Sequence, residues 1–306
     1  MLLPLLSVLI FLDVTSSIKD PEALNFIALG DWGTDKVPDE VDYQERVANK
    51  MAEWANETGL NFILTLGDNF YPVGANSVDD EQFNRKWRQV YLNPHPSLRV
   101  EWQISLGNHD HYLDNGKHQL EFSKVEPLWK IPKFFYTFTK KVGFLEVLFV
   151  VVDTESMYFT SNKGEQLDFL NTTLANSHAD WSIVAAHHPI FSTALHGNHE
   201  DLIDELRPIL IEHKVDFYIF GHDHVLQHLT GPSFDSVTYI GSGGGGQFPT
   251  VQIPEHLEEL KKWNITSNMF KNTNGFTAVK ITKEYTVIDF IDYNGEKFYS
   301  ITKTKS

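Results

Sequence analysis

The chain has 306 residues, a formal net charge of −16, and 42% hydrophobic and 22% charged residues. This length allows one large domain with its own hydrophobic core, and the composition is typical of a globular protein. The acidic charge argues against nucleic acid as a partner, because binding the phosphate backbone requires clustered lysine and arginine. The chain has no cysteine, which excludes a disulfide scaffold and thiolate chemistry but leaves secretion open.

The N-terminus resembles a secretion signal. Residues 1–12 are almost wholly apolar, and small residues follow at 15–17. This stretch is too short to span a bilayer, which takes about 20 residues, and it predicts a signal peptide over 1–17. It carries no lysine or arginine, so a buried N-terminal strand is the alternative. Three possible glycosylation triplets, which fit a secretory route, begin at Asn56, Asn171 and Asn264.

The next part of the chain alternates strands and helices. Apolar runs predict strands at 25–29, 62–66 and 101–106, and helical spacing predicts helices at 41–58 and 80–91. A glycine at position 59 is a suitable end for the first helix. The resulting strand–helix–strand unit favours a parallel pair of strands.

The remainder continues the alternation and ends in strands. The expected elements are a strand pair at 135–140 and 144–152, a helix at 165–175, a strand at 181–185, a helix at 201–213, strands at 218–220 and 238–240, and two or three strands over 276–302. An Asn294-Gly295 turn predicts a hairpin in the last segment. The glycine run at 241–246 lacks the lysine of a P-loop and is interpreted as a flexible strand-end loop. We expect one α/β domain with mixed sheets.

Five predicted strands end in the same way, with a small residue followed by a side chain that can bind metal. These pairs are Gly30-Asp31, Gly67-Asp68, Gly107-Asn108, Ala186-His187 and Gly221-His222. One such pair alone would most often be an ordinary turn. The carboxyl ends of parallel strands lie along one edge of a sheet, so five pairs predict a shared site for two metal ions.

The strand-end loops offer seven oxygen or imidazole ligands, namely Asp31, Asp68, Tyr71, Asn108, His187, His222 and His224. If Asp68 bridges, each ion can have four protein ligands. Asp31, Asp68 and a Tyr71 phenolate would give one ion three anionic groups, which favours a trivalent metal, and the imidazole-rich site favours a divalent one. Tyrosine, with a pKa of about 10, is a poor ligand for zinc or magnesium but a good one for Fe(III).

Several further histidines need an interpretation. His187 is preferred to His188 as a ligand because it directly follows the small residue, as in the other loops. Asp223, between two histidines, is expected to orient a ligand. His109 and His196 are expected to contact substrate, stabilising the transferring oxygens and protonating the leaving group. Four others were interpreted as ordinary surface or loop residues: His111, His118, His199 and His228.

Together these motifs resemble the purple acid phosphatases, and the chain length is similar to the small, animal-type, tartrate-resistant acid phosphatases. The matching stretches are Gly-Asp-Trp-Gly (30–33), Gly-Asp-Asn-Phe-Tyr (67–71), Gly-Asn-His-Asp (107–110), His-His-Pro (187–189) and Gly-His-Asp-His (221–224). The resemblance implies an α/β fold, a metallophosphatase β-sandwich of two mixed sheets flanked by helices, as in the calcineurin-like metallophosphatases. Residues 18–306 would form a single catalytic domain.

The resemblance also implies roles for individual residues. Fe(III) would be held by Asp31, Asp68, Tyr71 and His224. Fe(II), Zn(II) or Mn(II) would be held by Asp68, Asn108, His187 and His222. His109 and His196 match substrate-contacting histidines of the family. The chain departs from the family at His188, where a tyrosine is usual, and it lacks the cysteine pair of the vertebrate relatives.

The hypothesis is a secreted or lysosomal acid phosphatase that hydrolyses phosphate monoesters, either small molecules or phosphoproteins, by attack of a metal-bound hydroxide. We expect a monomer without a membrane anchor. One alternative is a divalent-metal phosphodiesterase or nucleotidase on the same fold. The colour of a Tyr71–Fe(III) pair would distinguish the iron-containing phosphatase from this alternative. Another is a secreted iron carrier with incidental turnover, which would not need His109 and His196.

Overall fold

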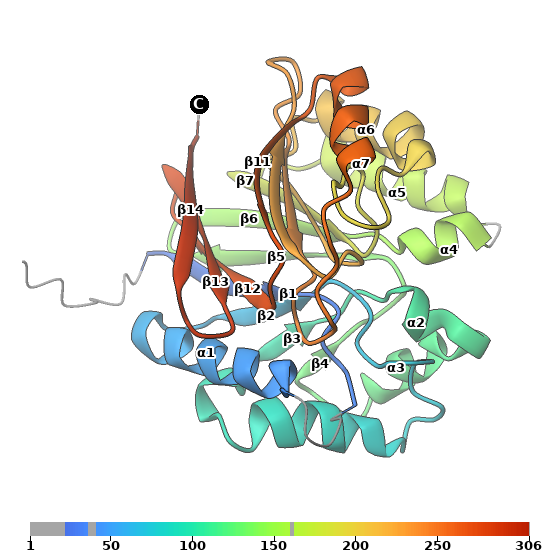
Figure 1. Cartoon of the computed structure of the whole chain (residues 1–306), viewed down its shortest axis with the longest axis vertical. Coiled ribbons are helices and arrows are strands. Elements are labelled where there is room, and N and C mark those ends of the chain that lie inside the picture. Colours follow the sequence, from blue (N-terminus) through green and yellow to red (C-terminus); the bar gives the residue numbers. More distant parts are fainter. Residues whose placement is uncertain (1–21, 36–40, 160–161, 306) are drawn as a thin grey trace, which may run out of the picture.

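Two seven-stranded mixed sheets form the centre of the computed structural model, which describes residues 22–35, 41–159 and 162–305 (Figure 1). The strand order is β14-β13-β12-β1-β2-β3-β4 in the first sheet and β11-β9-β10-β8-β7-β6-β5 in the second. Helices pack outside them. The α/β sandwich expected from the sequence is therefore confirmed, whereas the predicted signal peptide at 1–17 lies outside the described residues.

The first sheet contains the strand–helix–strand unit. Its strands are β1 (Leu24–Leu29), β2 (Phe62–Thr65), β3 (Glu101–Gln103), β4 (Trp129–Lys130), β12 (Gly275–Ile281), β13 (Tyr285–Asp292) and β14 (Lys297–Thr304). β1 and β2 are parallel and are joined through helix α1 (Tyr43–Thr58), as predicted. The helix ends at Gly59, whose φ of 80° is a conformation that glycine adopts easily.

The second sheet has a parallel centre and antiparallel edges. Its strands are β5 (Tyr136–Val142), β6 (Leu145–Val151), β7 (Trp181–Ala186), β8 (Phe217–Phe220), β9 (Leu226–Thr230), β10 (Thr238–Ser242) and β11 (Thr266–Lys271). β6, β7, β8 and β10 run parallel, and β5, β9 and β11 pair antiparallel with their neighbours. The sequence predicted the strands of this sheet except β9 and β11.

The helices are shorter and more numerous than predicted. Besides α1 they are α2 (Asn108–His111), α3 (Gly116–Phe122), α4 (Thr154–Phe159), α5 (Lys163–Ala175), α6 (Arg207–Glu212) and α7 (Pro254–Glu259). The helices predicted at 80–91 and 201–213 exist, but they contain the π-helical segments η1 (Phe83–Leu92) and η4 (Leu202–Leu206). Short 3₁₀ turns are η2 (Pro96–Leu98), η3 (Tyr112–Asp114) and η5 (Leu260–Trp263). None of the described helices is long and apolar enough to cross a membrane.

The side chains of β6 alternate between two hydrophobic layers of the interior. Phe149 contacts Phe26 and Phe62 across the gap between the sheets, with ring centroids 5.4 and 5.2 Å apart. Its neighbour Val150 belongs to a second cluster, which also contains Leu170 of α5. Successive side chains of a strand point to opposite faces, so one strand joins the inter-sheet core to the layer under the helices.

Backbone hydrogen bonds hold the ends of the two sheets together. The Gly30 amide donates to the Ser242 carbonyl over 2.8 Å, linking the end of β1 to the end of β10. The glycine run at 241–246 begins in the last two residues of β10 and is largely buried. A Cβ at Gly245 would lie 2.3 Å from the Gly30 carbonyl oxygen. The expected flexible loop is therefore a close-packed one, whose glycines allow two backbones to approach.

Candidate metal centre

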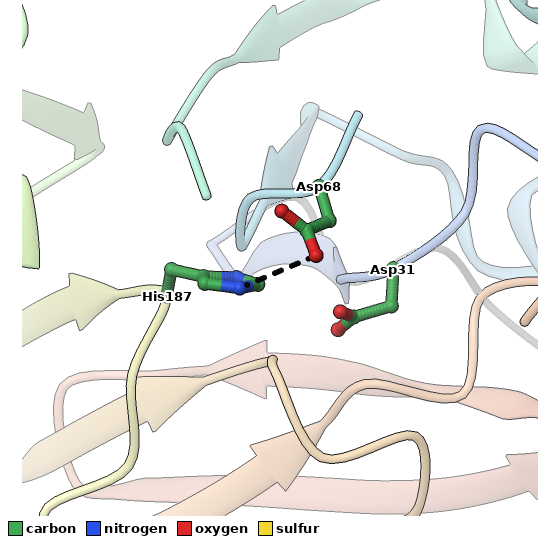
Figure 2. A group of neighbouring side chains, drawn as sticks. All are labelled: Asp31, Asp68 and His187. Carbon is green, nitrogen blue, oxygen red and sulfur yellow. Dashed lines mark ion pairs between the residues drawn. The ribbon is translucent and has the colours of Figure 1, made fainter. Parts of the chain in front are cut away.

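The carboxyl ends of five strands, three from the first sheet and two from the second, deliver the predicted ligands to one place. Asp31, Asp68 and Asn108 follow β1, β2 and β3, while His187 ends β7 and His222 follows β8. Tyr71 and His224 lie a few residues farther along two of these loops. Figure 2 shows Asp31, Asp68 and His187 pointing toward a common centre, where each offers a ligand atom within 4.8 Å of the others.

One side of the centre is built of oxygen donors. The Tyr71 hydroxyl lies 3.0 Å from Asp31 Oδ1 and 2.9 Å from Asp68 Oδ2, and donates toward both carboxylates. It is also 3.2 Å from His224 Nε2. The two carboxylates are buried. This half therefore gathers the anionic groups and one imidazole, as the sequence predicted.

The other side is rich in imidazole. His187 Nε2 lies 3.0 Å from Asn108 Oδ1 and 3.1 Å from His222 Nδ1. It is 3.5 Å from Asp68 Oδ2, the same oxygen that Tyr71 contacts. Asp68 thus contacts both halves, the position that a bridging ligand requires. The adjacent His188 Nδ1 lies 2.9 Å from the Thr154 hydroxyl, and its ring centroid is 4.4 Å from that of His222, so the preference for His187 as the ligand stays a prediction.

Three of these residues have an unusual backbone conformation. Asp31, Asp68 and His222 have φ angles of 60°, 51° and 66°, in the left-handed region that residues with a Cβ rarely adopt. Each follows directly after a glycine at the end of a strand. Such conformations cost about 1–3 kcal/mol each and are concentrated at functional sites.

Second partners fix the orientation of two imidazoles. His187 Nδ1 donates to the Leu66 carbonyl over 2.8 Å, and His224 Nδ1 donates to the Phe248 carbonyl over 3.1 Å. Each Nε2 is therefore the unprotonated nitrogen and faces the centre with a free lone pair. A carbonyl that fixes the tautomer in this way is typical of metal-binding histidines.

The electrostatics of the group favour a bound cation. Burial, and then the charge of Asp68, raise the pKa of the Asp31 carboxyl well above its usual range. Burial also raises the pKa of Tyr71 and lowers the pKa of His187 and His222. Among the described ion pairs, Asp31 and Asp68 have only histidine partners. Buried anionic groups without a lysine or arginine, beside neutral imidazoles, are a suitable donor set for metal ions.

The two predicted substrate-contacting histidines border the same centre. The His109 ring lies 4.5 Å from the Tyr71 ring, and its Nδ1 donates to the Pro72 carbonyl over 2.6 Å. The His196 ring lies 4.0 Å from the His222 ring.

Asp223 holds His196 through both the backbone amide and Nδ1, over 3.1 and 2.8 Å. The Ser192 hydroxyl also donates to the Asp223 carboxylate. The expectation that Asp223 orients a metal ligand stays a prediction, because these described hydrogen bonds lead to His196 and Ser192.

Sequence reasoning missed two buried partners of the site. Asp110 accepts hydrogen bonds from the backbone amides of Asn69, Phe70 and Gly107, and so joins two ligand loops. Its place three residues after a strand-end glycine was the available signal. His111 pairs with buried Asp153 at 2.9 Å.

His228, predicted like His111 to be a surface or loop residue, is buried in strand β9. Its ring contacts Tyr299, which belongs to the other sheet. Those two predictions were wrong, because a polar residue can be buried wherever the fold supplies a partner.

The comparisons with known proteins agree with this geometry. The Calcineurin-like phosphoesterase family matches residues 24–226. Tartrate-resistant acid phosphatase type 5 is 31% identical both in Sus scrofa (92% of this chain, 86% of the relative) and in Homo sapiens (90% of each). The chain belongs to the purple acid phosphatases. Purple acid phosphatase 4 of Arabidopsis thaliana is 30% identical over 92% of this chain and 84% of its own length.

Solved structures confirm the fold. The Plasmodium protein GAP50, described as the anchor in the inner membrane complex, superposes with a TM-score of 0.78 at 22% identity, covering 93% of this chain and 89% of that one. Purple acid phosphatase PPD1 from yellow lupin gives a TM-score of 0.68 at 16% identity, covering 94% of this chain and 54% of that one. By its family and its sequence relatives, the protein described here is an enzyme of the acid phosphatase class, and its family uses two metal ions.

Proposed function

We propose that the protein is a secreted or lysosomal acid phosphatase that hydrolyses phosphate monoesters at a dinuclear centre of Fe(III) and a divalent ion, Fe(II), Zn(II) or Mn(II). The observation that carries the proposal is the Tyr71 hydroxyl, which lies within 3.0 Å of two buried carboxylates. A phenol placed there becomes an anionic ligand once a trivalent ion replaces its proton. Substrates are small phosphate monoesters or phosphoproteins.

The ligand sets follow the two halves of the centre. Asp31, Asp68, Tyr71 and His224 hold Fe(III), and Asp68, Asn108, His187 and His222 hold the divalent ion. Bound together, the ions supply water of lowered pKa and positive charge that stabilises a transferring phosphoryl group. The left-handed turns at Asp31, Asp68 and His222 keep these side chains aimed inward before any ion arrives.

His109 and His196 act on the substrate. Each ring has its Nδ1 engaged, by the Pro72 carbonyl or by Asp223, which leaves each Nε2 for a phosphate or leaving-group oxygen, to which it donates when the ring is protonated. The hydrogen bond that His196 donates to Asp223, together with the charge of Asp223, raises the pKa of His196. His196 is therefore protonated at acidic pH and loses its proton as the pH rises, so its help to an anionic transition state falls with increasing pH.

The secretory route has separate support. The side chains of Asn56, Asn171 and Asn264 are all exposed, and exposure is what N-linked glycosylation requires. Expression through a secretory pathway, followed by enzymatic removal of N-glycans, should lower the mass of the protein. An unchanged mass would argue against this part of the proposal.

One set of measurements tests the function. The purified protein should contain iron, absorb visible light through phenolate-to-Fe(III) charge transfer, and hydrolyse an aryl phosphate monoester faster than a bis-aryl diester at acidic pH. A colourless protein that contains only zinc and prefers the diester would point to a divalent-metal phosphodiesterase. A coloured protein without turnover would point to an iron carrier.

A further inference from the structure

A cavity opens beside the imidazole-rich half of the centre. It has a volume of about 510 Å3 and is lined by Asn108, His111, Tyr112, Glu155, Tyr158, His188, His199 and His222. Asn108 and His222 are also proposed ligands of the divalent ion. A phosphate held at the centre would therefore have this cavity at its side. The group esterified to that phosphate could occupy it.

The cavity has an aromatic wall. The rings of Tyr158 and His199 are stacked, with centroids 4.2 Å apart and planes 17° from parallel. The His188 ring stands nearly perpendicular to both, at 82° to Tyr158 and 81° to His199. Tyr112, which is 53% exposed, contributes another ring from the segment η3. Rings from separate elements facing one cavity can surround a compact group.

Glu155 supplies the carboxylate of the cavity. Its side chain is only 16% exposed, and His188 Nε2 lies 3.6 Å from its Oε2, which is beyond hydrogen-bonding distance. No described residue donates a hydrogen bond to it. Burial raises the pKa of Glu155 to about 7. A half-buried carboxylate without a donor, facing a cavity, is suited to a ligand that brings a cationic donor.

The other titratable groups do not supply that cation. Burial lowers the pKa of His199. His111 is paired with Asp153 at 2.9 Å. No lysine or arginine lines the cavity among the described residues. Although burial opposes it, the pairing with Asp153 raises the pKa of His111. Burial, opposed by the charge of His111, raises the pKa of Glu155 to about 7, so its carboxylate is anionic near and above pH 7, and a bound ammonium would favour the anionic form.

We propose that this cavity is a leaving-group subsite for phosphate monoesters whose alkyl group carries an ammonium, which Glu155 binds and the aromatic rings of Tyr158 and His199 surround. This inference rests on the proposed function, because it takes the phosphate to lie at the metal centre. His188 helps to form the wall, held by the Thr154 hydroxyl and by the Tyr218 hydroxyl, which donates to the His188 carbonyl over 2.7 Å. The subsite would select substrates by charge.

The kinetic test compares two substrates of similar size with the metal-loaded protein. The value of kcat/KM should be higher for 2-aminoethyl phosphate than for ethyl phosphate. Glu155→Gln should lower that ratio about tenfold, which corresponds to about 1.4 kcal/mol, while hydrolysis of an aryl phosphate continues. Tyr158→Leu should lower the ratio and Tyr158→Phe should keep it. Glu165→Gln, an exposed change on the adjacent helix α5, is the matched control. A ratio that Glu155→Gln leaves unchanged overturns the subsite.

A binding test separates the subsite from the proposed activity. 2-Aminoethylphosphonate and ethylphosphonate carry carbon–phosphorus bonds, so calorimetry of their binding does not depend on turnover. The wild-type protein should prefer the ammonium compound, and Glu155→Gln should lose the preference. If that result appears without hydrolysis of any ester, the proposed function fails and the subsite stands. If neither phosphonate binds, or both bind equally, the subsite is wrong even when an aryl phosphate is hydrolysed.

Discussion

Tyr71 has the most specific chemistry of the residues at the centre. Replacing it with phenylalanine removes one oxygen ligand and keeps the ring beside His109. We expect Tyr71→Phe to lose the visible absorption band of the iron-loaded protein, because no phenolate remains to donate charge to Fe(III). Absorption spectroscopy with metal analysis measures this. If the band persists in a variant that still contains iron, Tyr71 is not the ligand.

Asp110 shows that a residue without a proposed ligand role can control the centre. It joins the loop that carries Asp68 to the loop that carries Asn108, and it also accepts from the Gln119 side chain over 2.7 Å. Asp110→Asn would replace an acceptor oxygen with an NH2 group facing buried amide donors, which leaves polar groups unpaired. We expect metal affinity to fall about 10–100-fold. Competition with a chelator measures it, and exposed Asp114→Asn, close by in the chain, should leave the affinity unchanged.

At this scale, what the sequence could predict depended on adjacency along the chain. Five of the proposed ligands were recognisable because each follows a small residue at the end of an apolar run. Glu155 carried no such signal. It lies in α4, a helix of six residues with no repeated apolar spacing, and it meets His188 only because the fold brings two loops together. A contact between segments 33 residues apart has no local pattern in the sequence.

Between elements, a buried histidine joins the two sheets. His228 of β9 lies 3.0 Å from the hydroxyl of Tyr299 in β14. Burial lowers the pKa of His228 from 6.5 to about 4. The unfolded chain therefore takes up a proton at a higher pH than the folded one. The stability that neutral His228 contributes is complete above pH 6.5 and is lost as the pH falls toward 4.

We expect the free energy of unfolding to fall by up to about 3 kcal/mol across that window because of His228 alone. Urea unfolding at several pH values should show a smaller acid-side loss for His228→Gln than for the wild type. His178→Gln, at an exposed position, should keep the wild-type pH dependence. Equal losses in the wild type and His228→Gln would contradict the assignment.

Helices and strands that are long and regular were predicted from the sequence, whereas short or irregular ones were missed. The site strands β1, β2, β7 and β8 were recognised because each is a largely apolar run. β9 was missed because Gln227 and His228 interrupt the apolar pattern, although both are buried. α2 was missed because its four residues are too few to show a helical period.

For the whole molecule, the arrangement of ligands connects metal binding to stability. Asp31 and Asp68 follow strands of the first sheet, while His187 and His222 follow strands of the second. An ion held by both groups cross-links the sheets only in the folded state. A ligand present at about 1,000 times its Kd stabilises a fold by about 4 kcal/mol.

We therefore expect removal of the metals by a chelator to lower the Tm clearly and reversibly. Thermal unfolding should show a decrease after chelation and a recovery when iron and the divalent ion are returned. Variants that lose ligands, such as His187→Ala, should respond much less to the chelator. An identical Tm with and without metal would show that ions do not join the sheets.

The left-handed turns at the centre have a consequence for how sequences of this kind evolve. The Asp31 carboxyl is buried close to Asp68, and these surroundings raise its pKa, so its anionic form destabilises the protein until a cation is bound. The φ of 60° at Asp31 adds backbone strain with or without the cation. Asparagine tolerates that φ and carries no charge. Without metal, Asp31→Asn should therefore melt at a higher temperature than the wild type, and with metal the order should reverse. Selection for a durable fold alone would remove this residue, so only selection for a metal-loaded enzyme preserves it.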